Sequence, residues 1–189
     1  ARAPGDYLWD FAASSRLTQA MSPKSTELYP ELESSPYTRF AKSRTSTRFQ
    51  IESSLSLLPK GITLNIQCMI GNGIMVQEGY EKALADAKDL VQSVSDLGLR
   101  QTDEVGIDVL VNTRSSYSLH TDQGSVMEEL YPKETFWAGL LSCFGMANKY
   151  CVDEIPSKSV AAVSGQYLRN LGEDALKRLF FGNFVLMDG

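Results

Sequence analysis

The sequence predicts an α+β domain. An antiparallel hairpin and further strands would form a small sheet with helices packed on one face, and an extended N-terminal arm would precede it. Two segments, 47–58 and 62–70, alternate apolar and polar residues as strands do. A third segment, 80–97, carries apolar residues at helical spacing. Strands mixed with helices in this order, without a repeated strand–helix unit, are typical of the α+β class.

The N-terminal part of the chain is predicted to be a helix followed by an arm. Tyr7, Leu8 and Phe11 recur at helical spacing within residues 6–21. Residues 24–43 are rich in serine, threonine and proline, which favours an extended arm over a packed element. We therefore expect residues 1–44 to form a helix and arm, and residues 45–189 to form the core domain.

The predicted hairpin joins two alternating segments through a turn. In residues 47–58, apolar side chains such as Phe49 and Ile51 would share one face. Pro59-Lys60-Gly61 is a turn sequence, because proline presets φ and glycine accepts positive φ. Residues 62–70 alternate again, so an antiparallel pair is expected.

The long segment 80–97 is predicted to be a helix. Tyr80, Leu84, Ala87, Val91 and Val94 step by four and three residues, as one face of a helix does. We expect the remaining elements in this order: a strand at 105–113, a short helix at 125–131, a helix at 134–150, a strand at 157–163, a helix at 172–180 and a strand at 184–187.

Composition and charge bear on location and partners. The net charge of -5 makes nucleic acid an unlikely partner class, because phosphates attract basic surfaces. Three cysteines are too few for a disulfide scaffold, and no N-glycosylation sequence occurs. No apolar run approaches the roughly 20 residues needed to span a bilayer. We therefore expect a soluble intracellular or organellar protein without a membrane span.

Short catalytic and phosphate-binding motifs are incomplete. Gly71-Asn72-Gly73 lies between a predicted strand and helix, but Val76 occupies the place of the third glycine in a dinucleotide fingerprint. His120 is the single histidine, with Asp122 as the nearest group that could orient it. No G-x-S-x-G elbow occurs, so the motifs favour a turn and a polar loop over a catalytic site.

The cysteines and carboxylates suggest no metal centre and no defined cofactor. A structural zinc site needs close pairs of Cys or His ligands, and Cys143 and Cys151 are too far apart in sequence to form one. No cofactor is implied by motif. If a cofactor were attached covalently through a thiol, Cys68, Cys143 and Cys151 would be the three candidate positions.

One basic and aromatic region is a candidate for partner binding. Its residues are Tyr37, Arg39, Phe40, Lys42, Arg44 and Arg48. In an acidic chain, such a segment could bind an acidic protein surface, a phosphate or a single-stranded nucleic acid. Alternatively, it is a solvated connection whose aromatic side chains pack onto the domain.

Three functional hypotheses follow. The favoured one is a non-enzymatic structural or assembly subunit, because the arm and the apolar residues near Phe180 and Phe184 suit burial against other protein subunits. The second is a small-ligand-binding protein or enzyme, with Tyr117, His120 and Asp122 as the first candidates for its site. The third is a linker that carries a chromophore on a cysteine.

Overall fold

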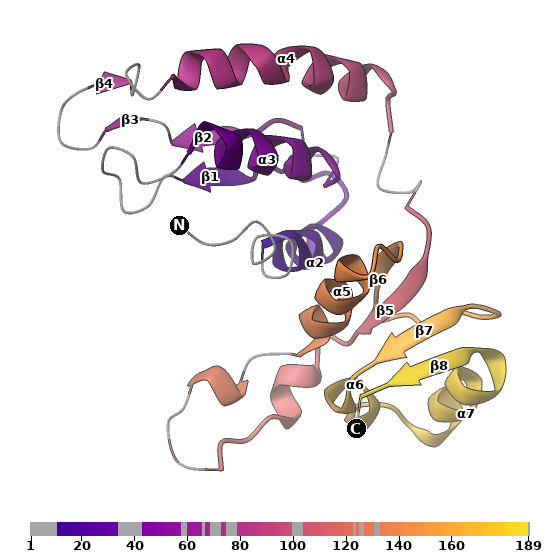
Figure 1. The fold of residues 1–189 in the computed structure, drawn as a ribbon. Coiled ribbons are helices and arrows are strands. Elements are labelled where there is room, and N and C mark those ends of the chain that lie inside the picture. Colours follow the sequence, from indigo (N-terminus) through magenta and orange to yellow (C-terminus); the bar gives the residue numbers. More distant parts are fainter. Residues whose placement is uncertain are drawn as a thin grey trace. The chain divides into compact units, whose positions relative to one another are not determined.

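The structure is a computed structural model that describes residues 11–33, 43–57, 60–65, 67–68, 73–74, 79–99, 104–122, 124, 127–130 and 133–188. These residues belong to two compact units (Figure 1). The first unit contains the described residues between 23 and 99. The second contains residues 11–22 and those from 104 onward.

The first unit is built from short strands and two helices. Strands β1 (Glu31–Glu33) and β2 (Thr63–Asn65) pair in parallel, and β3 (Gln67–Cys68) pairs antiparallel with β4 (Gly73–Ile74). Helix α3 (Arg44–Leu55) contacts both β1 and helix α4 (Tyr80–Asp96). The predicted helix at 80–97 is confirmed by α4.

The predicted antiparallel hairpin is wrong, because its first segment is helix α3. The Ser43 side chain caps this helix by accepting a hydrogen bond of 3.1 Å from the backbone N–H of Ser46. The buried residues Thr47, Ile51 and Ser54 recur at helical spacing. Ile51 and Leu55 are four residues apart and share a face in a helix as well as in a strand, whereas the buried Thr47 and Ser54 are polar, so the apolar pattern alone misassigned this segment.

The second predicted strand has a different partner from the one expected. Strand β2 pairs with β1 from the predicted arm, with Leu32 opposite Leu64, and the pair is parallel. Leu32 is almost completely buried, which explains why this short stretch joins the sheet. Residues 34–42 of the arm lie outside the described residues, and the division at residue 44 stays a prediction.

The second unit contains a sheet of four parallel strands. In spatial order they are β6 (Asn148–Val152), β5 (Ile107–Val111), β7 (Val160–Val163) and β8 (Phe184–Met187) (Figure 1). Three helices lie between these strands in sequence: α5 (Glu134–Cys143), α6 (Gly165–Arg169) and α7 (Glu173–Gly182). Helix-connected parallel strands define an α/β arrangement, so the α+β class expected from the sequence is corrected.

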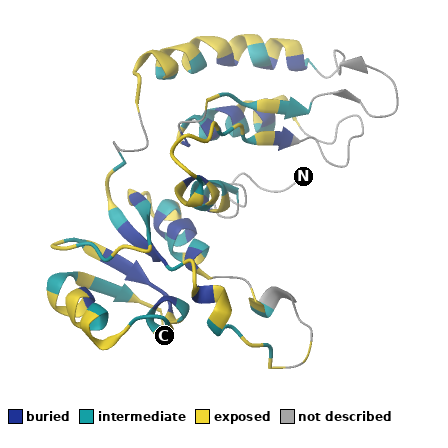
Figure 2. Cartoon of the chain, turned by 180° about the vertical axis from the view of Figure 1, so that it is seen from behind, coloured by how far each residue is buried: buried dark blue, intermediate teal, exposed yellow. Residues whose placement is uncertain are grey.

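Helices cover both faces of this sheet, not one face as predicted. Val109 packs with Ala138 and Leu141 of α5, whereas the next residue, Leu110, packs with Tyr167 of α6 and Leu179 of α7. Successive strand residues point to opposite faces, so these two clusters lie on opposite sides. Figure 2 shows the resulting dark blue, buried colour along β5 and β7. Parallel strands normally require this double cover.

Helix α2 (Ala13–Met21) belongs to the second unit, where it contacts β6 and α5. The Tyr150 hydroxyl donates a 2.9 Å hydrogen bond to the Ala13 carbonyl oxygen. The Arg16 guanidinium donates a 3.0 Å hydrogen bond to the side-chain oxygen of Asn148, and it also contacts the Asn148 carbonyl oxygen. These bonds attach the latter part of the predicted helix 6–21 to the β6 edge of the sheet.

The predicted helix at 134–150 ends early and is followed by strand β6. Helix α5 stops at Cys143, and Gly145 then adopts a positive φ of 68°. The buried Asn148 side chain donates hydrogen bonds to the Ser142 hydroxyl and the Met146 carbonyl oxygen. These contacts stabilise a tight turn, so Phe144 and Ala147 are exposed and not packed inward as expected.

Several predictions for the C-terminal half are confirmed. Strand β5 lies within the predicted segment 105–113, and β8 matches 184–187.

Gly106 precedes β5 with a φ of 127°, and a Cβ there would collide with the Ala147 carbonyl, so this position requires glycine. Among the described residues, no helix is both long and apolar enough to cross a bilayer.

The packing of helix α7 against the sheet leads to a testable prediction. Leu179 is fully buried, whereas Phe181 in the same helix is 90% exposed. Leu179→Ala should lower the free energy of unfolding by about 2–5 kcal/mol, because it leaves a cavity in the core. Phe181→Ala should change it by about 0.5 kcal/mol or less. Urea denaturation of both variants tests this, and equal losses would contradict the described packing.

Candidate functional site

The partner-binding residues predicted from the sequence divide into two groups. Tyr37, Arg39, Phe40 and Lys42 lie outside the described residues. Arg44 and Arg48 lie on α3, and the Arg48 Nε donates a 2.6 Å hydrogen bond to the Glu52 carboxylate one turn away. Arg48 therefore already has an acidic partner within its own helix, and partner binding by the whole group stays a prediction.

The second set of candidates lies on an exposed segment after β5. Tyr117 is 84% exposed, and His120 and Asp122 are also exposed. The Asp122 backbone N–H donates a 3.0 Å hydrogen bond to the Glu129 carboxylate, which orders the segment. Neither cavity described below is lined by any of these three residues.

The two described thiols differ in environment. Cys143 is exposed at the end of α5, and Cys151 is half-buried in β6, where its thiol contacts the Glu154 carbonyl oxygen at 3.4 Å. Burial raises the pKa of Cys151 to about 11, and the Asp108 carboxylate adds to this rise. Cys151 is therefore a thiol at neutral pH and a weak nucleophile. The Cys68 side chain lies outside the described residues, and covalent cofactor attachment stays a prediction.

The described residues show neither an anion-binding glycine turn nor a metal centre. Gly71 and Asn72 lie outside the described residues, and Gly73 begins β4. In the described part of the chain, no three His, Cys, Asp or Glu side chains gather in a way that could hold a metal ion.

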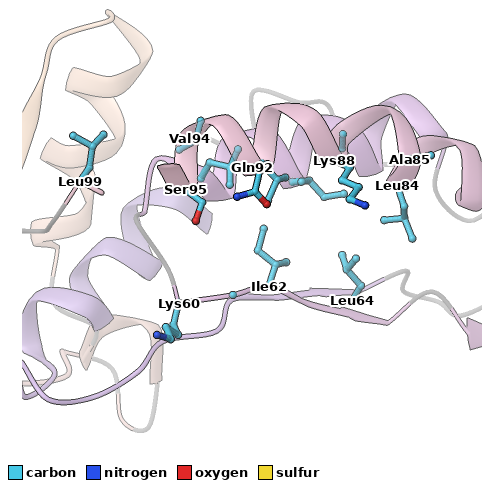
Figure 3. A pocket seen from close by; sticks show the side chains of 15 residues that line it. Lys60, Ile62, Leu64, Leu84, Ala85, Lys88, Gln92, Val94, Ser95 and Leu99 are labelled. Carbon is cyan, nitrogen blue, oxygen red and sulfur yellow. The ribbon is translucent and has the colours of Figure 1, made fainter. Parts of the chain in front are cut away.

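The first unit contains a cavity of about 740 Å³ between α4 and the layer formed by α3 and β2. Its lining is mostly aliphatic. In Figure 3, Ile62 and Leu64 point toward α4, and Leu84 points back from the helix. The aliphatic residues that line it are Ile51, Leu55, Ile62, Leu64, Leu84, Ala85, Ala87, Val91, Val94 and Leu99.

This cavity exists because α4 is incompletely covered. Tyr80, Ala83 and Ala87 are the buried residues of the helix, whereas Leu84, Val91 and Val94 are only half-buried. Figure 2 shows the same feature as a helix that is mainly teal and yellow. The apolar face of α4, which the sequence suggests is core, therefore lines a cavity instead.

The charged residues of the lining are both cations. Lys60 precedes β2 and Lys88 lies on α4, and no carboxylate lines the cavity. Lys60 pairs at 3.8 Å with the exposed Glu27 carboxylate. Within the described ranges, Lys88 has no ion-pair partner. In a chain of net charge -5, this lining favours a ligand that carries negative charge.

The second unit contains a separate cluster of buried polar groups at one end of its sheet. Ser115, Glu134 and Ser164 are each 1% exposed. The two serine Oγ atoms and both Glu134 carboxyl oxygens lack a hydrogen-bond partner of ordinary geometry among the described residues. Such groups are costly to bury, which makes them candidates for contact with a ligand.

The Glu134 carboxyl is electrostatically unusual. Burial raises its pKa above the ordinary value of 4.5, and the negative charge of Asp188 acts in the same direction. The nearby backbone N–H and Ser115 hydroxyl lower the pKa in part, although neither makes a hydrogen bond of ordinary geometry to it. Folding therefore stabilises the neutral acid more than it does for an exposed glutamate.

Neither the cavity nor the polar cluster was identified from the sequence. The members of the polar cluster are far apart in sequence, and the cavity joins one face of α4 to residues 51–64, which no local pattern connects with it. Glu134 and Ser164 do stand at helix starts, but acidic and serine residues are common there for local reasons. Only the fold reveals that they meet.

Comparison with known proteins identifies no relative: no protein family, curated protein or solved structure matches the chain.

The buried Glu134 makes a testable prediction. Because its pKa is raised in the folded state, its stabilising contribution is present below pH 4.5 and is lost as pH rises through the raised pKa. Glu134→Gln keeps the shape but cannot ionise. Relative to the parent, the variant should gain stability with rising pH, by up to about 1.4 kcal/mol per pH unit in that window.

Urea denaturation across this pH range provides the measurement. Glu173→Gln is a suitable control, because Glu173 is an exposed residue paired with Lys177 on α7. If the Glu134→Gln and parent curves of unfolding free energy against pH run parallel, the electrostatic description of Glu134 is wrong.

Proposed function

We propose that the chain is a small-ligand-binding protein whose first unit holds an elongated, amphipathic anion in the cavity beside α4. The observation that carries this proposal is the cavity itself. Its volume of about 740 Å³ falls within the range of ordinary small-molecule sites, and its walls are mostly aliphatic. No catalytic step is assigned to it.

An apolar ligand would complete the packing of this unit. Half-buried aliphatic residues such as Leu84 and Val91 gain stability when further apolar surface covers them. The cavity lies between α4 and the layer formed by α3 and β2, so an extended hydrocarbon chain parallel to α4 suits it. A bulky polar ligand would leave these aliphatic side chains without apolar contacts.

The two lysines support an anionic end group. Lys88 and Lys60 lie on opposite walls, and neither has a carboxylate neighbour in the lining. A carboxylate or sulfonate at one end of the ligand would meet a flexible ammonium group without leaving the solvent. Fatty acids and similar detergents have this chemistry, and dodecanoate is a convenient probe.

The binding proposal predicts a position-specific effect on α4. Val91 lines the cavity, whereas the neighbouring Leu90 does not and is 41% exposed. Val91→Phe should narrow the cavity beside α4 and weaken dodecanoate binding by about tenfold or more, whereas Leu90→Phe should leave it unchanged. Isothermal titration calorimetry measures both. Equal affinities for the two variants would refute this site.

The charge of the ligand is tested separately with a neutral analogue. Lys88→Glu should weaken dodecanoate binding by about fivefold and leave dodecanol binding unchanged, since only the carboxylate meets the ammonium group. Lys82→Glu on the same helix, outside the cavity, is the control. A similar loss for both probes would argue against recognition of the anion.

A second candidate function is attachment to another protein subunit. It is favoured by an apolar patch on α7 and β8, where Phe181 is 90% and Phe184 68% exposed, with Phe180 and Met187 beside them in sequence. Within the described sheet, β8 is an edge strand, and such strands can pair with another chain. We extend this proposal to an intracellular location, which the free thiols of Cys143 and Cys151 support.

The subunit proposal predicts loss of a partner on mutation of the patch. A tagged chain isolated gently from its natural host should carry a stoichiometric partner, which the double variant Phe181→Ser, Phe184→Ser should lose. Leu97→Ser, at an exposed residue outside the patch, should retain it. Native mass spectrometry reports the composition, and a partner bound equally to all three forms would contradict this role for the patch.

A further inference from the structure

The sheet of the second unit has a topological switch point between β5 and β7. The chain leaves β5 toward α5 on one face, and it leaves the adjacent β7 toward α6 and α7 on the other face. In open α/β sheets, connections that diverge in this way open a crevice at the carboxyl ends of the strands, where ligands bind.

The unpartnered polar cluster lies at these carboxyl ends. Ser115 follows β5 by a short turn, Ser164 directly follows β7, and Glu134 begins α5. Trp137 of α5 donates a 3.0 Å hydrogen bond to the Val163 carbonyl oxygen, which fixes α5 against the end of β7. The cluster is therefore held by the regular elements of the fold.

A cavity of about 420 Å³ adjoins the cluster. It is lined by Lys133, Phe136, Gly165, Gln166, Arg169 and Asp188. Lys133 directly precedes Glu134, and Gly165 directly follows Ser164. Asp188 follows β8 and acts electrostatically on Glu134, which places the cavity and the cluster at the same end of the sheet.

The groups at this end are mainly hydrogen-bond donors. Arg169, Lys133 and Gln166 supply N–H groups to the cavity, and Asp188 is the one carboxylate in its lining. Helix α5 also begins here without a side-chain cap, so its positive end faces this region. A metal ion is disfavoured by the two cationic side chains. A ligand with several acceptor oxygens and negative charge is favoured.

We propose that the carboxyl end of this sheet binds the phosphate group of a small organic molecule in this cavity, with Arg169 and Lys133 holding the phosphate beside the buried polar cluster. Asp188, which is exposed, accepts hydrogen bonds from hydroxyl groups on the organic part. Phe136, 43% exposed, provides an apolar wall. This site is independent of the cavity in the first unit.

Gly165 offers a way to block the site without removing a charge. A Cβ at this position has no neighbour within 4 Å, and the residue lines the cavity. Gly165→Leu should therefore fold normally and project its side chain into the space for the ligand. Arg169→Gln removes the guanidinium instead, and Arg178→Gln on α7, outside the cavity, is the matched control for lost charge.

The test is a ¹H–¹⁵N NMR titration of the full chain with inorganic phosphate, against chloride at equal ionic strength. We expect saturable shifts at Gly165 and Gln166, and affinities weakened by about tenfold or more in Arg169→Gln and Gly165→Leu, with Arg178→Gln unchanged. Absence of saturable shifts in the parent, or equal weakening by both arginine variants, would overturn the proposal.

Discussion

The second unit depends on the burial of its two central strands on both faces. Val109 and Leu110 of β5 are completely buried, as are Ala161 to Val163 of β7, although neighbouring residues on a strand point in opposite directions. Each face therefore needs its own cover, which α2 and α5 supply on one side and α6 and α7 on the other. The helices and their order follow from this requirement.

The same requirement positions the polar groups. Because all four strands are parallel, their carboxyl ends lie at the same end of the sheet. The chain leaves β5 and β7 toward opposite faces there. Ser115, Glu134 and Ser164 occupy the turns and helix starts at that end. Among the described residues, their buried side chains make no hydrogen bond of ordinary geometry, which is a local cost of a kind often found where a protein binds a ligand.

The first unit covers its apolar side chains less completely than the second unit does. Its strands are short, and its long helix α4 has a wider apolar face than they cover. Leu84 and Val91 therefore remain half-buried around a cavity, whereas residues of the same type in the second unit form a closed core. The difference between a core and a binding surface lies in what covers the face.

The sequence predicts some of this fold and little of the sites. The helix at α4 and the strands β5 and β8 were identified because their periodicity is strong and their boundaries are marked. Helix α3 was misassigned because Ile51 and Leu55 fit both a strand face and a helical face, whereas the buried Thr47 and Ser54 are polar and add nothing to an apolar helical stripe. Strand β6 was missed because apolar spacing continues through Phe144 and Ala147 beyond the end of α5.

Parallel pairing between β1 and β2 could not be predicted, because it joins residues some thirty positions apart without a local turn. The site residues were equally hidden. Ser115 and Ser164 are ordinary in their local sequence, and only the sheet order brings them to one end of the sheet. The cavity residues form part of an apolar stripe whose spacing indicates a helix but not what covers it.

We propose above all that the incompletely covered apolar face of α4 binds a ligand. The most direct test is a methyl ¹H–¹³C NMR titration of the chain with dodecanoate. We expect saturable shifts at the methyl groups of Leu64, Leu84 and Val91, with those of Val109 and Leu110 in the closed core unchanged. Shifts concentrated elsewhere, or none that saturate, would contradict it.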